Sequence, residues 1–142
     1  VMGTNDLAKE TGAVLDAERM PFLFALSATL NAARAYGIGA IDGVHNDIAD
    51  IAGLEYQAIQ AKKIGFDGKS IIHPSQIDIV NQVFSPSEGE IAEASAIVDA
   101  FNLPENAGKG AIKVNGKMAE FLHRDMALKT LAIAKRIQNI KT

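Results

Sequence analysis

The sequence contains no cysteine, no tryptophan and only 6% aromatic residues. Without cysteine, the chain cannot form a disulfide, a zinc–thiolate centre or a cysteine nucleophile. No apolar run approaches the roughly 18 residues of a membrane span, and no signal peptide is visible. We therefore expect a protein of a reducing compartment, the cytoplasm, without a membrane partner.

Neither sign of charge is in large excess. The chain has 14 basic and 17 acidic residues and a net charge of −3. Nucleic-acid binding usually requires a clustered basic face, so we expect no nucleic-acid partner. The 142 residues are 48% hydrophobic and 22% charged, which is ordinary for a globular domain and unlike a disordered chain.

Short apolar segments alternate with helical patterns in the first part of the chain. Val1 and Met2 read as the end of a buried strand, and further strands are predicted at 38–44 and 70–72. A helix is predicted over about 16–37, with Asp16 as its cap and an apolar face of Phe22, Leu26, Leu30 and Ala33. A second helix is predicted over about 51–64, with Asp50 as its cap and a buried stripe of Leu54, Ala58 and Ala61. This alternation is typical of a parallel α/β sheet or barrel. A parallel sheet with so few strands would leave unpaired edges. We therefore expect neighbouring strands from a longer chain or from another chain.

The part after about residue 85 predicts a helix, a hairpin and a second helix. Ser85 and Glu88 have the spacing of a capping box, and Pro86 suits the first helical position. Asn115-Gly116 is typical of a type I′ hairpin turn. The last helix is predicted over about 122–140, with an apolar stripe formed by Leu122, Met126, Ile133, Ile137 and Ile140.

Polar side chains follow the predicted strands, at the end where ligands bind in parallel α/β folds. Asp6 could hold Mg²⁺, which prefers one or two carboxylates together with water and substrate oxygens. Alternatively, Asp6 could simply cap a short helix that begins at Leu7. Asp42 and Asp47 flank the end of the next strand and could contact a ligand or form turns.

Three other polar residues have open roles. His73, next to Pro74, could be a general base, a ligand contact or a structural hydrogen-bonding group. Lys69 ends a Gly-Phe-Asp-Gly-Lys segment that lacks the spacing of a phosphate loop. The lysine could still meet a phosphate as a point charge. Glu120 precedes the last helix, where the helix dipole favours a carboxylate without any catalytic role.

Several segments, taken together, resemble the citrate lyase beta-subunit family within the larger group of metal-dependent aldolases. Their order and spacing agree along nearly the whole chain, which makes the combination far more specific than any one of them. The segments are Gly3 to Ala8, Asp42 to Ile48, Gly65 to Lys69, Ile72 to Ile77 and Gly116 to Met118.

The resemblance implies a (β/α)₈ barrel. Residues 1–84 would supply the end of its sixth strand through its eighth strand. Residues 85–142 would be a C-terminal helical extension that covers the active site of a neighbouring subunit in a trimer or hexamer. The start at Val1-Met2 then reads as a cut inside the sixth strand.

The resemblance also implies Mg²⁺-dependent C–C bond cleavage or formation in acyl-CoA substrates such as malyl-CoA or citryl-CoA, with a 2-oxo acid as product. Asp6 matches the family's second metal carboxylate. Asp42, Asp47, His73 and Pro74 would lie on the CoA side of the barrel mouth. Glu120 matches the acid of the extension, where many members have aspartate.

Two departures from the family pattern limit these expectations. The extra methylene of Glu120 moves its carboxylate, and a misplacement near 1 Å can cost roughly 10²-fold in rate. The family's first metal glutamate and its substrate arginine lie on earlier strands, outside this chain. We therefore expect no lyase activity from these residues alone. The alternatives are a malyl-CoA thioesterase, in which water attacks the acyl carbonyl, and a non-catalytic half-barrel partner.

Overall fold

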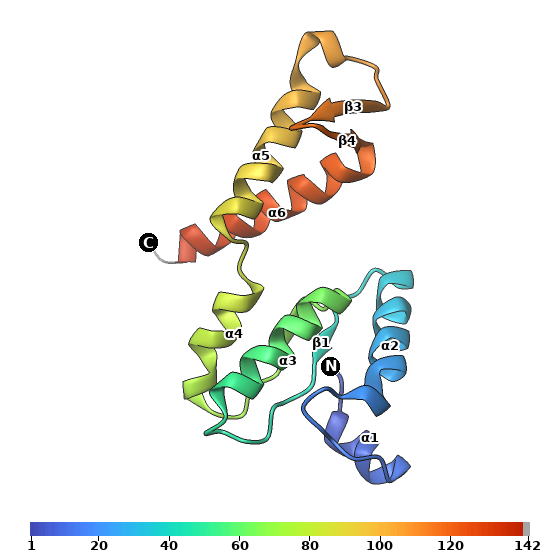
Figure 1. Ribbon diagram of the computed structural model, residues 1–142, viewed down its shortest axis with the longest axis vertical. Coiled ribbons are helices and arrows are strands. Elements are labelled where there is room, and N and C mark those ends of the chain that lie inside the picture. The colour runs from blue at the N-terminus through green and yellow to red at the C-terminus, as the bar shows by residue number, and fades with distance from the viewer. Residues whose placement is uncertain (141–142) are drawn as a thin grey trace. The chain divides into compact units, whose positions relative to one another are not determined.

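The computed structural model describes residues 1–140, and the chain divides between Phe84 and Ser85 into two units (Figure 1). Each unit has its own arrangement of helices and strands. Unit 1 covers Val1–Phe84, and unit 2 begins at Ser85.

Unit 1 alternates helices with very short strands, as the sequence predicts. Its elements are α1 (Thr4–Thr11), η1 (Met20–Phe22), α2 (Leu23–Ala35), β1 (Ile41–Asp42), α3 (Ile51–Ile64), β2 (Gly68–Lys69), η2 (Pro74–Gln76) and α4 (Ile77–Phe84). The strands are shorter than predicted, and the second lies just before the predicted 70–72 segment. Pro74 and the turn at His73 leave no room for a longer second strand.

The two strands of unit 1 pair in parallel, with Ile41 opposite Gly68 and Asp42 opposite Lys69. The Asp42 carbonyl accepts from the N–H of Ser70 on the β2 side at 2.9 Å. The Ile41 carbonyl accepts from the N–H of Met2 at 2.8 Å. Successive carbonyls of a strand point to opposite edges, so the chain at Met2 lies along the edge of β1 away from β2.

Apolar residues at helical spacing form the core of unit 1. The α2 face predicted from the sequence is buried, with Leu26 fully inaccessible and Leu30 and Ala33 nearly so. The predicted face of α3 is buried too. Phe22, Ala40, Ala61 and Phe66 complete the cluster. Gly65 ends α3 with a φ of 113°, a conformation that favours glycine.

Two helix starts differ from the prediction. The first helix begins at Thr4 with Gly3 as its N-cap, so Asp6 lies inside the first turn and does not cap it. Asp16 does not cap α2, which begins only at Leu23. Asp16 instead accepts a hydrogen bond from the N–H of Arg19 at 2.5 Å and closes a turn before η1.

Unit 2 consists of α5 (Glu88–Asn102), η3 (Pro104–Asn106), the antiparallel hairpin β3 (Ala111–Val114) and β4 (Lys117–Glu120), and α6 (Phe121–Ile140). Asn115 and Gly116 both have positive φ, as a type I′ turn requires. The capping box is two residues later than predicted, because Ser87 caps α5 and Glu90 returns its hydrogen bond. Figure 1 shows α5 and α6 side by side.

The apolar stripe predicted for the last helix is largely exposed. Met126 is 62% and Ile140 is 83% accessible, whereas the buried positions of α6 are Ala127 and Ala134. The small alanine side chains allow α6 to lie close to its neighbours in unit 2, and the larger side chains point elsewhere. Among the described residues, no helix is long and apolar enough to cross a membrane.

Candidate functional site

Asp6, the predicted metal ligand, lies in the first turn of α1 with an exposed side chain. Its neighbour Asn5 forms a reciprocal pair of side-chain hydrogen bonds with Asn46, at 2.9 and 2.8 Å. Asn46 lies in the loop that follows β1. The start of α1 and this loop are therefore held together, next to the predicted carboxylate.

Gly43 allows the same two segments to approach closely. A Cβ atom placed on Gly43 would lie 2.5 Å from the Thr4 hydroxyl oxygen and 3.0 Å from the carbonyl oxygen of Met2. Real Cβ atoms do not approach other atoms so closely. The Asp-Gly-Val segment thus needs its glycine so that α1 can sit against the end of β1.

Asp42 lies at the centre of a buried ion cluster. Its side chain is fully inaccessible, and both carboxylate oxygens accept from Arg19 Nη1 at 2.8 Å. Lys69 Nζ donates to the same carboxylate at 2.9 Å and to the carbonyl of Gly43 at 2.7 Å. Asp42 thereby joins β1, β2 and the turn before η1. Contact of Asp42 with a CoA substrate stays a prediction.

Lys69 has a structural position that its sequence context did not indicate. Its side chain is fully inaccessible and pairs with Asp42. A contact of this point charge with a phosphate stays a prediction. Burial lowers the pKa of Lys69, and the charge and hydrogen bond of Asp42 oppose that shift. The strand pairing explains the position, because Lys69 is the register partner of Asp42.

Arg19 is a second buried cation that the sequence reading missed. Only 2% of its side chain is exposed, and it also donates to the Gln57 carbonyl at 3.3 Å and to Gln60 Oε1 at 2.8 Å. Its backbone has a φ of 56°, which is uncommon for a residue other than glycine. No local pattern marks this arginine, because its partners lie 23 to 41 positions along the chain.

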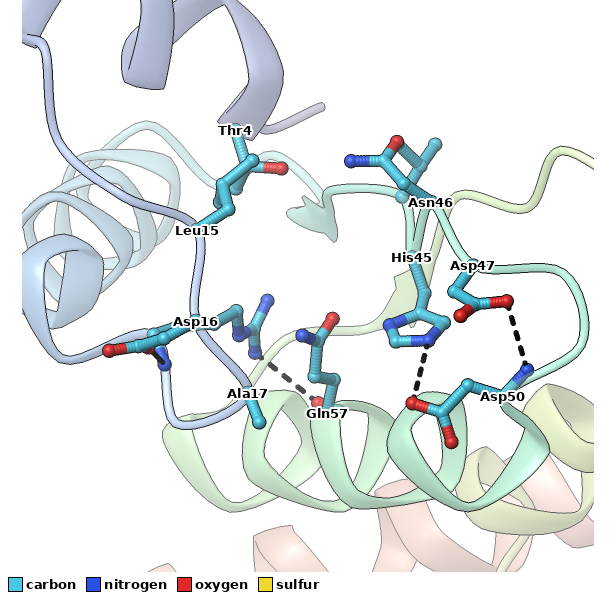
Figure 2. Close-up of a pocket in the computed structure, with 11 residues that line it drawn as sticks. Thr4, Leu15, Asp16, Ala17, His45, Asn46, Asp47, Asp50 and Gln57 are labelled. Atoms are coloured by element: carbon cyan, nitrogen blue, oxygen red, sulfur yellow. Dashed lines mark hydrogen bonds and ion pairs between the residues drawn. The ribbon is translucent and has the colours of Figure 1, made fainter.

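A pocket of about 230 Å³ opens beside this cluster (Figure 2). Its polar lining comes from the start of α1, the loop after β1, the N-cap and first half of α3, and the segment before η1. The lining includes Thr4, His45, Asn46, Asp47, Asp50 and Gln57. The loop that carries the predicted Asp47 thus shares this pocket with Thr4, two positions before Asp6.

Asp47 has a turn-forming role in addition to its place in the pocket. Its Oδ1 accepts from the N–H groups of Ala49 and Asp50, at 3.0 and 3.3 Å. This arrangement is the turn that aspartate commonly forms. Asp50 then caps α3, as the sequence predicts, by accepting from the N–H of Gly53 at 2.9 Å.

His73 and Pro74 lie at the start of η2, and both are exposed. The Nδ1 atom of His73 accepts from the N–H of Ser75 at 3.2 Å and lies 2.8 Å from the Ser75 hydroxyl. The ring therefore has a structural capping role. A substrate contact by either residue stays a prediction.

Glu120 is the last residue of β4 in unit 2, and its side chain is exposed. Its backbone N–H donates to His123 Nδ1 at 2.9 Å, which links the hairpin to the first turn of α6. The structure describes Glu120 only within its own unit. Its predicted action on a neighbouring subunit stays a prediction.

A magnesium site would need ligands beyond those near Asp6. Among the described residues, no group of three or more His, Asp or Glu side chains could hold a metal ion. The exposed Asp6 carboxylate suits a Mg²⁺ ion that keeps water and substrate oxygens as ligands. The exposed Asp6 carboxylate is therefore available as one ligand of such an ion.

Residues 1–74 match the HpcH/HpaI aldolase/citrate lyase family, which is more than half of the chain. The chain belongs to this family. The match contains every site residue that the sequence predicts in unit 1, namely Asp6, Asp42, Asp47, His73 and Pro74.

Three curated relatives show the range of activities in the family. A (3S)-malyl-CoA thioesterase of Cereibacter sphaeroides is 46% identical over 96% of this chain. The mitochondrial citramalyl-CoA lyase of Homo sapiens is 36% identical over 97% of it, and the citrate lyase subunit beta of Escherichia coli is 35% identical over 84%. The chain spans 48%, 41% and 39% of these three proteins, respectively.

A solved structure agrees with the fold. The protein CitE of Mycobacterium tuberculosis, crystallised with magnesium, acetoacetate and coenzyme A, superposes with a TM-score of 0.69 at 34% identity. The match covers 88% of this chain and 44% of that protein. The chain thus has an α/β fold similar to that of CitE.

Proposed function

We propose that this chain is part of a Mg²⁺-dependent acyl-CoA lyase that cleaves a malyl-CoA-type substrate into acetyl-CoA and a 2-oxo acid. The observation that carries the proposal is the exposed carboxylate of Asp6, which directly follows Asn5, the residue that pairs with Asn46 of the loop after β1. The relatives named above support the substrate class, because their names include malyl-CoA and citramalyl-CoA.

Unit 1 would be the C-terminal portion of a (β/α)₈ barrel. The parallel β1–β2 pair and the hydrogen bond from Met2 to the other edge of β1 support this proposal, since they place three consecutive segments side by side. The remaining strands would come from the rest of a longer protein or from a second chain. Unit 2 would be the helical extension of this barrel.

In the proposed reaction, Asp6 would hold the metal ion, and a bound Mg²⁺ would act as a Lewis acid that stabilises charge on the 2-oxo acid. The Asn5–Asn46 pair would fix the distance between Asp6 and the pocket. Asp47, His73 and Pro74 would contact the CoA portion from the loops after β1 and β2, with Asp42 behind them. Glu120 would supply an acid to a neighbouring subunit.

The proposal includes a cytoplasmic homo-oligomer, a trimer or a hexamer. Large apolar side chains of unit 2 are exposed, including Met118 at 71% and Met126 at 62%, and subunit contacts would cover them. The molar mass in solution, measured by light scattering, tests this part of the proposal. A monomer at all concentrations would contradict it.

The test of the lyase uses the complete gene product with Mg²⁺ and malyl-CoA, methylmalyl-CoA or citryl-CoA. We expect Asp6→Ala to abolish metal-dependent release of the 2-oxo acid. Glu10→Ala is the matched control, because Glu10 is an exposed carboxylate on the same helix. Equal loss in both variants, or no loss in Asp6→Ala, would remove Asp6 from the metal site.

A thioesterase is the second candidate, and a specific observation favours it. Identity is 46% to the malyl-CoA thioesterase and 35–36% to the two lyases. The products distinguish the activities, since hydrolysis releases malate and free CoA, whereas cleavage releases glyoxylate and acetyl-CoA. A complete gene product with neither activity would favour a non-catalytic partner.

A further inference from the structure

His45 is the histidine that lines the pocket. Its side chain is only 10% exposed, and its Nε2 atom is buried without a hydrogen-bond partner. The nearest charged group is the Asp50 carboxylate, whose Oδ2 lies 3.5 Å from Nε2. Figure 2 shows this edge of the ring facing Asp50 and the opposite edge turned toward Gln57 across the pocket.

The Asp50 carboxylate has a fixed orientation. As the N-cap of α3, it accepts from the N–H of Gly53 with Oδ1, and this leaves Oδ2 directed at His45. Its own N–H donates to Asp47 Oδ1. A carboxylate held in this way can orient an imidazole so that Nε2 carries the proton and Nδ1 is the base.

Gly53 keeps the space that the pair occupies. A Cβ atom there would collide with the Asp50 carboxylate and would lie 3.1 Å from Cε1 of His45. Glycine inside a helix costs about 1 kcal/mol relative to alanine. Helix formation alone would therefore favour alanine at this position, and the pair requires glycine.

The backbone of His45 is also held. Its carbonyl accepts from Gln76 Nε2 at 3.2 Å, and Gln76 is fully buried. The same glutamine accepts from the N–H of Ile72 at 3.0 Å. Gln76 thereby joins the loops after β1 and β2.

The other histidines do not share these features. His73 is exposed, and its Nδ1 accepts from the N–H of Ser75. His123 lies in unit 2, and its Nδ1 accepts from the N–H of Glu120. Of the three histidines of the chain, His45 alone lines this pocket and faces a carboxylate with its buried nitrogen.

We propose that His45 is the general base for hydrolysis of an acyl-CoA thioester and that Asp50 is its positioning residue. This inference rests on the proposed function and assigns one residue pair to the hydrolytic branch. Nδ1 takes a proton from a water molecule, whose oxygen attacks the thioester carbonyl. The C–S bond then breaks with its electron pair going to sulfur. The imidazolium returns the proton to the thiolate, which gives a free acid and a free thiol.

The experiment follows both product pairs with the complete gene product, malyl-CoA and Mg²⁺. General-base catalysis contributes at least about 10²-fold, so we expect His45→Gln to lower malate release by about that factor. Glyoxylate release should change by no more than a few-fold. Asp50→Asn should give a smaller loss of malate release, because asparagine still caps the helix. Glu55→Gln, on the exposed side of the same helix, is the charge control.

The outcomes separate this inference from the proposed function. Wild-type protein with neither activity overturns the proposed function. Wild-type cleavage without hydrolysis, or equal loss of both activities in His45→Gln, overturns the inference alone. Nitrogen-15 NMR of the complete wild-type protein provides a measurement that does not depend on whether any variant folds. It should show the proton of His45 on Nε2, and a proton on Nδ1 would overturn the assignment of Nδ1 as the base.

Discussion

Unit 1 and unit 2 place their charged groups differently. Unit 1 buries Arg19, Asp42 and Lys69 together, through hydrogen bonds between segments 23 and 27 positions apart. The ion pair between Lys117 and Glu93 in unit 2 is exposed, with 81% and 59% of the side chains accessible. Unit 2 instead has a local capping box and a two-residue turn. Unit 1 therefore has an ion cluster in its interior, whereas the Lys117–Glu93 pair of unit 2 lies at the surface.

The largest expected effect is a loss of stability on removing a charge from the buried ion cluster of unit 1. Asp42→Asn leaves two buried cations without a carboxylate, and breaking a buried ion pair costs about 3–5 kcal/mol. We expect the free energy of unfolding of unit 1 to fall by about that amount in urea denaturation. Glu93→Gln in unit 2 should change stability by less than about 1 kcal/mol. Similar effects in the two variants would contradict the contrast between the units.

A pair of glycine substitutions gives an intermediate effect of opposite sign in the two units. Gly53→Ala in α3 displaces the Asp50 carboxylate and should lower stability by about 1 kcal/mol or more, as expected for a lost N-cap. Gly89→Ala in α5 meets only the Ser87 hydroxyl at 4.0 Å and should raise stability by up to about 1 kcal/mol. Denaturant midpoints measure both changes. Stabilisation by Gly53→Ala would show that the space beside His45 is not needed.

The smallest expected effect is pH-dependent and involves the exposed ion pair of unit 1. Hydrogen bonds from Arg34 lower the pKa of Asp67 below its ordinary value, and the N–H of Ala40 adds a further bond. The resulting stability is present above about pH 3.9 and is lost as the pH falls through the lowered pKa. Both side chains are nearly half exposed, so the contribution is below about 1 kcal/mol.

Asp67→Asn should therefore flatten the acid side of a plot of unfolding free energy against pH. Arg34→Lys should remove most of the same dependence, because lysine cannot form the two hydrogen bonds that the guanidinium makes with the carboxylate. An unchanged acid dependence in Asp67→Asn would assign that dependence to other carboxylates.

Local signals in the sequence predict most helices and the hairpin. The range of α3, its cap at Asp50 and the turn at Asn115-Gly116 are confirmed, because neighbouring residues determine them. The capping box lies two residues later than predicted. Both Ser85 and Ser87 have a glutamate three positions later, so the local spacing fits either serine. The apolar stripe of α6 does not coincide with its buried face, because helical periodicity does not show which face of a helix a neighbouring element covers.

The candidate site was less predictable than the fold. Asp47 and Asp50 could be placed in a loop and at a helix start, because their roles are local. The cluster around Asp42 could not, since Arg19 reaches it across 23 positions and its own segment carries no pattern. The pairing of His45 with Asp50 also depends on the space left by Gly53, which appears only once α3 is folded.

The Asn5–Asn46 pair has a further consequence, because each amide both donates and accepts. Neither group gains or loses a proton across the physiological range, and neither carries a net charge for salt to screen. The distance between Asp6 and the loop that carries His45 thus depends on an electrically neutral pair of hydrogen bonds. Acid, higher ionic strength or a bound divalent cation would each change the electrostatic interactions of neighbouring carboxylates. None of them would break the Asn5–Asn46 hydrogen bonds directly.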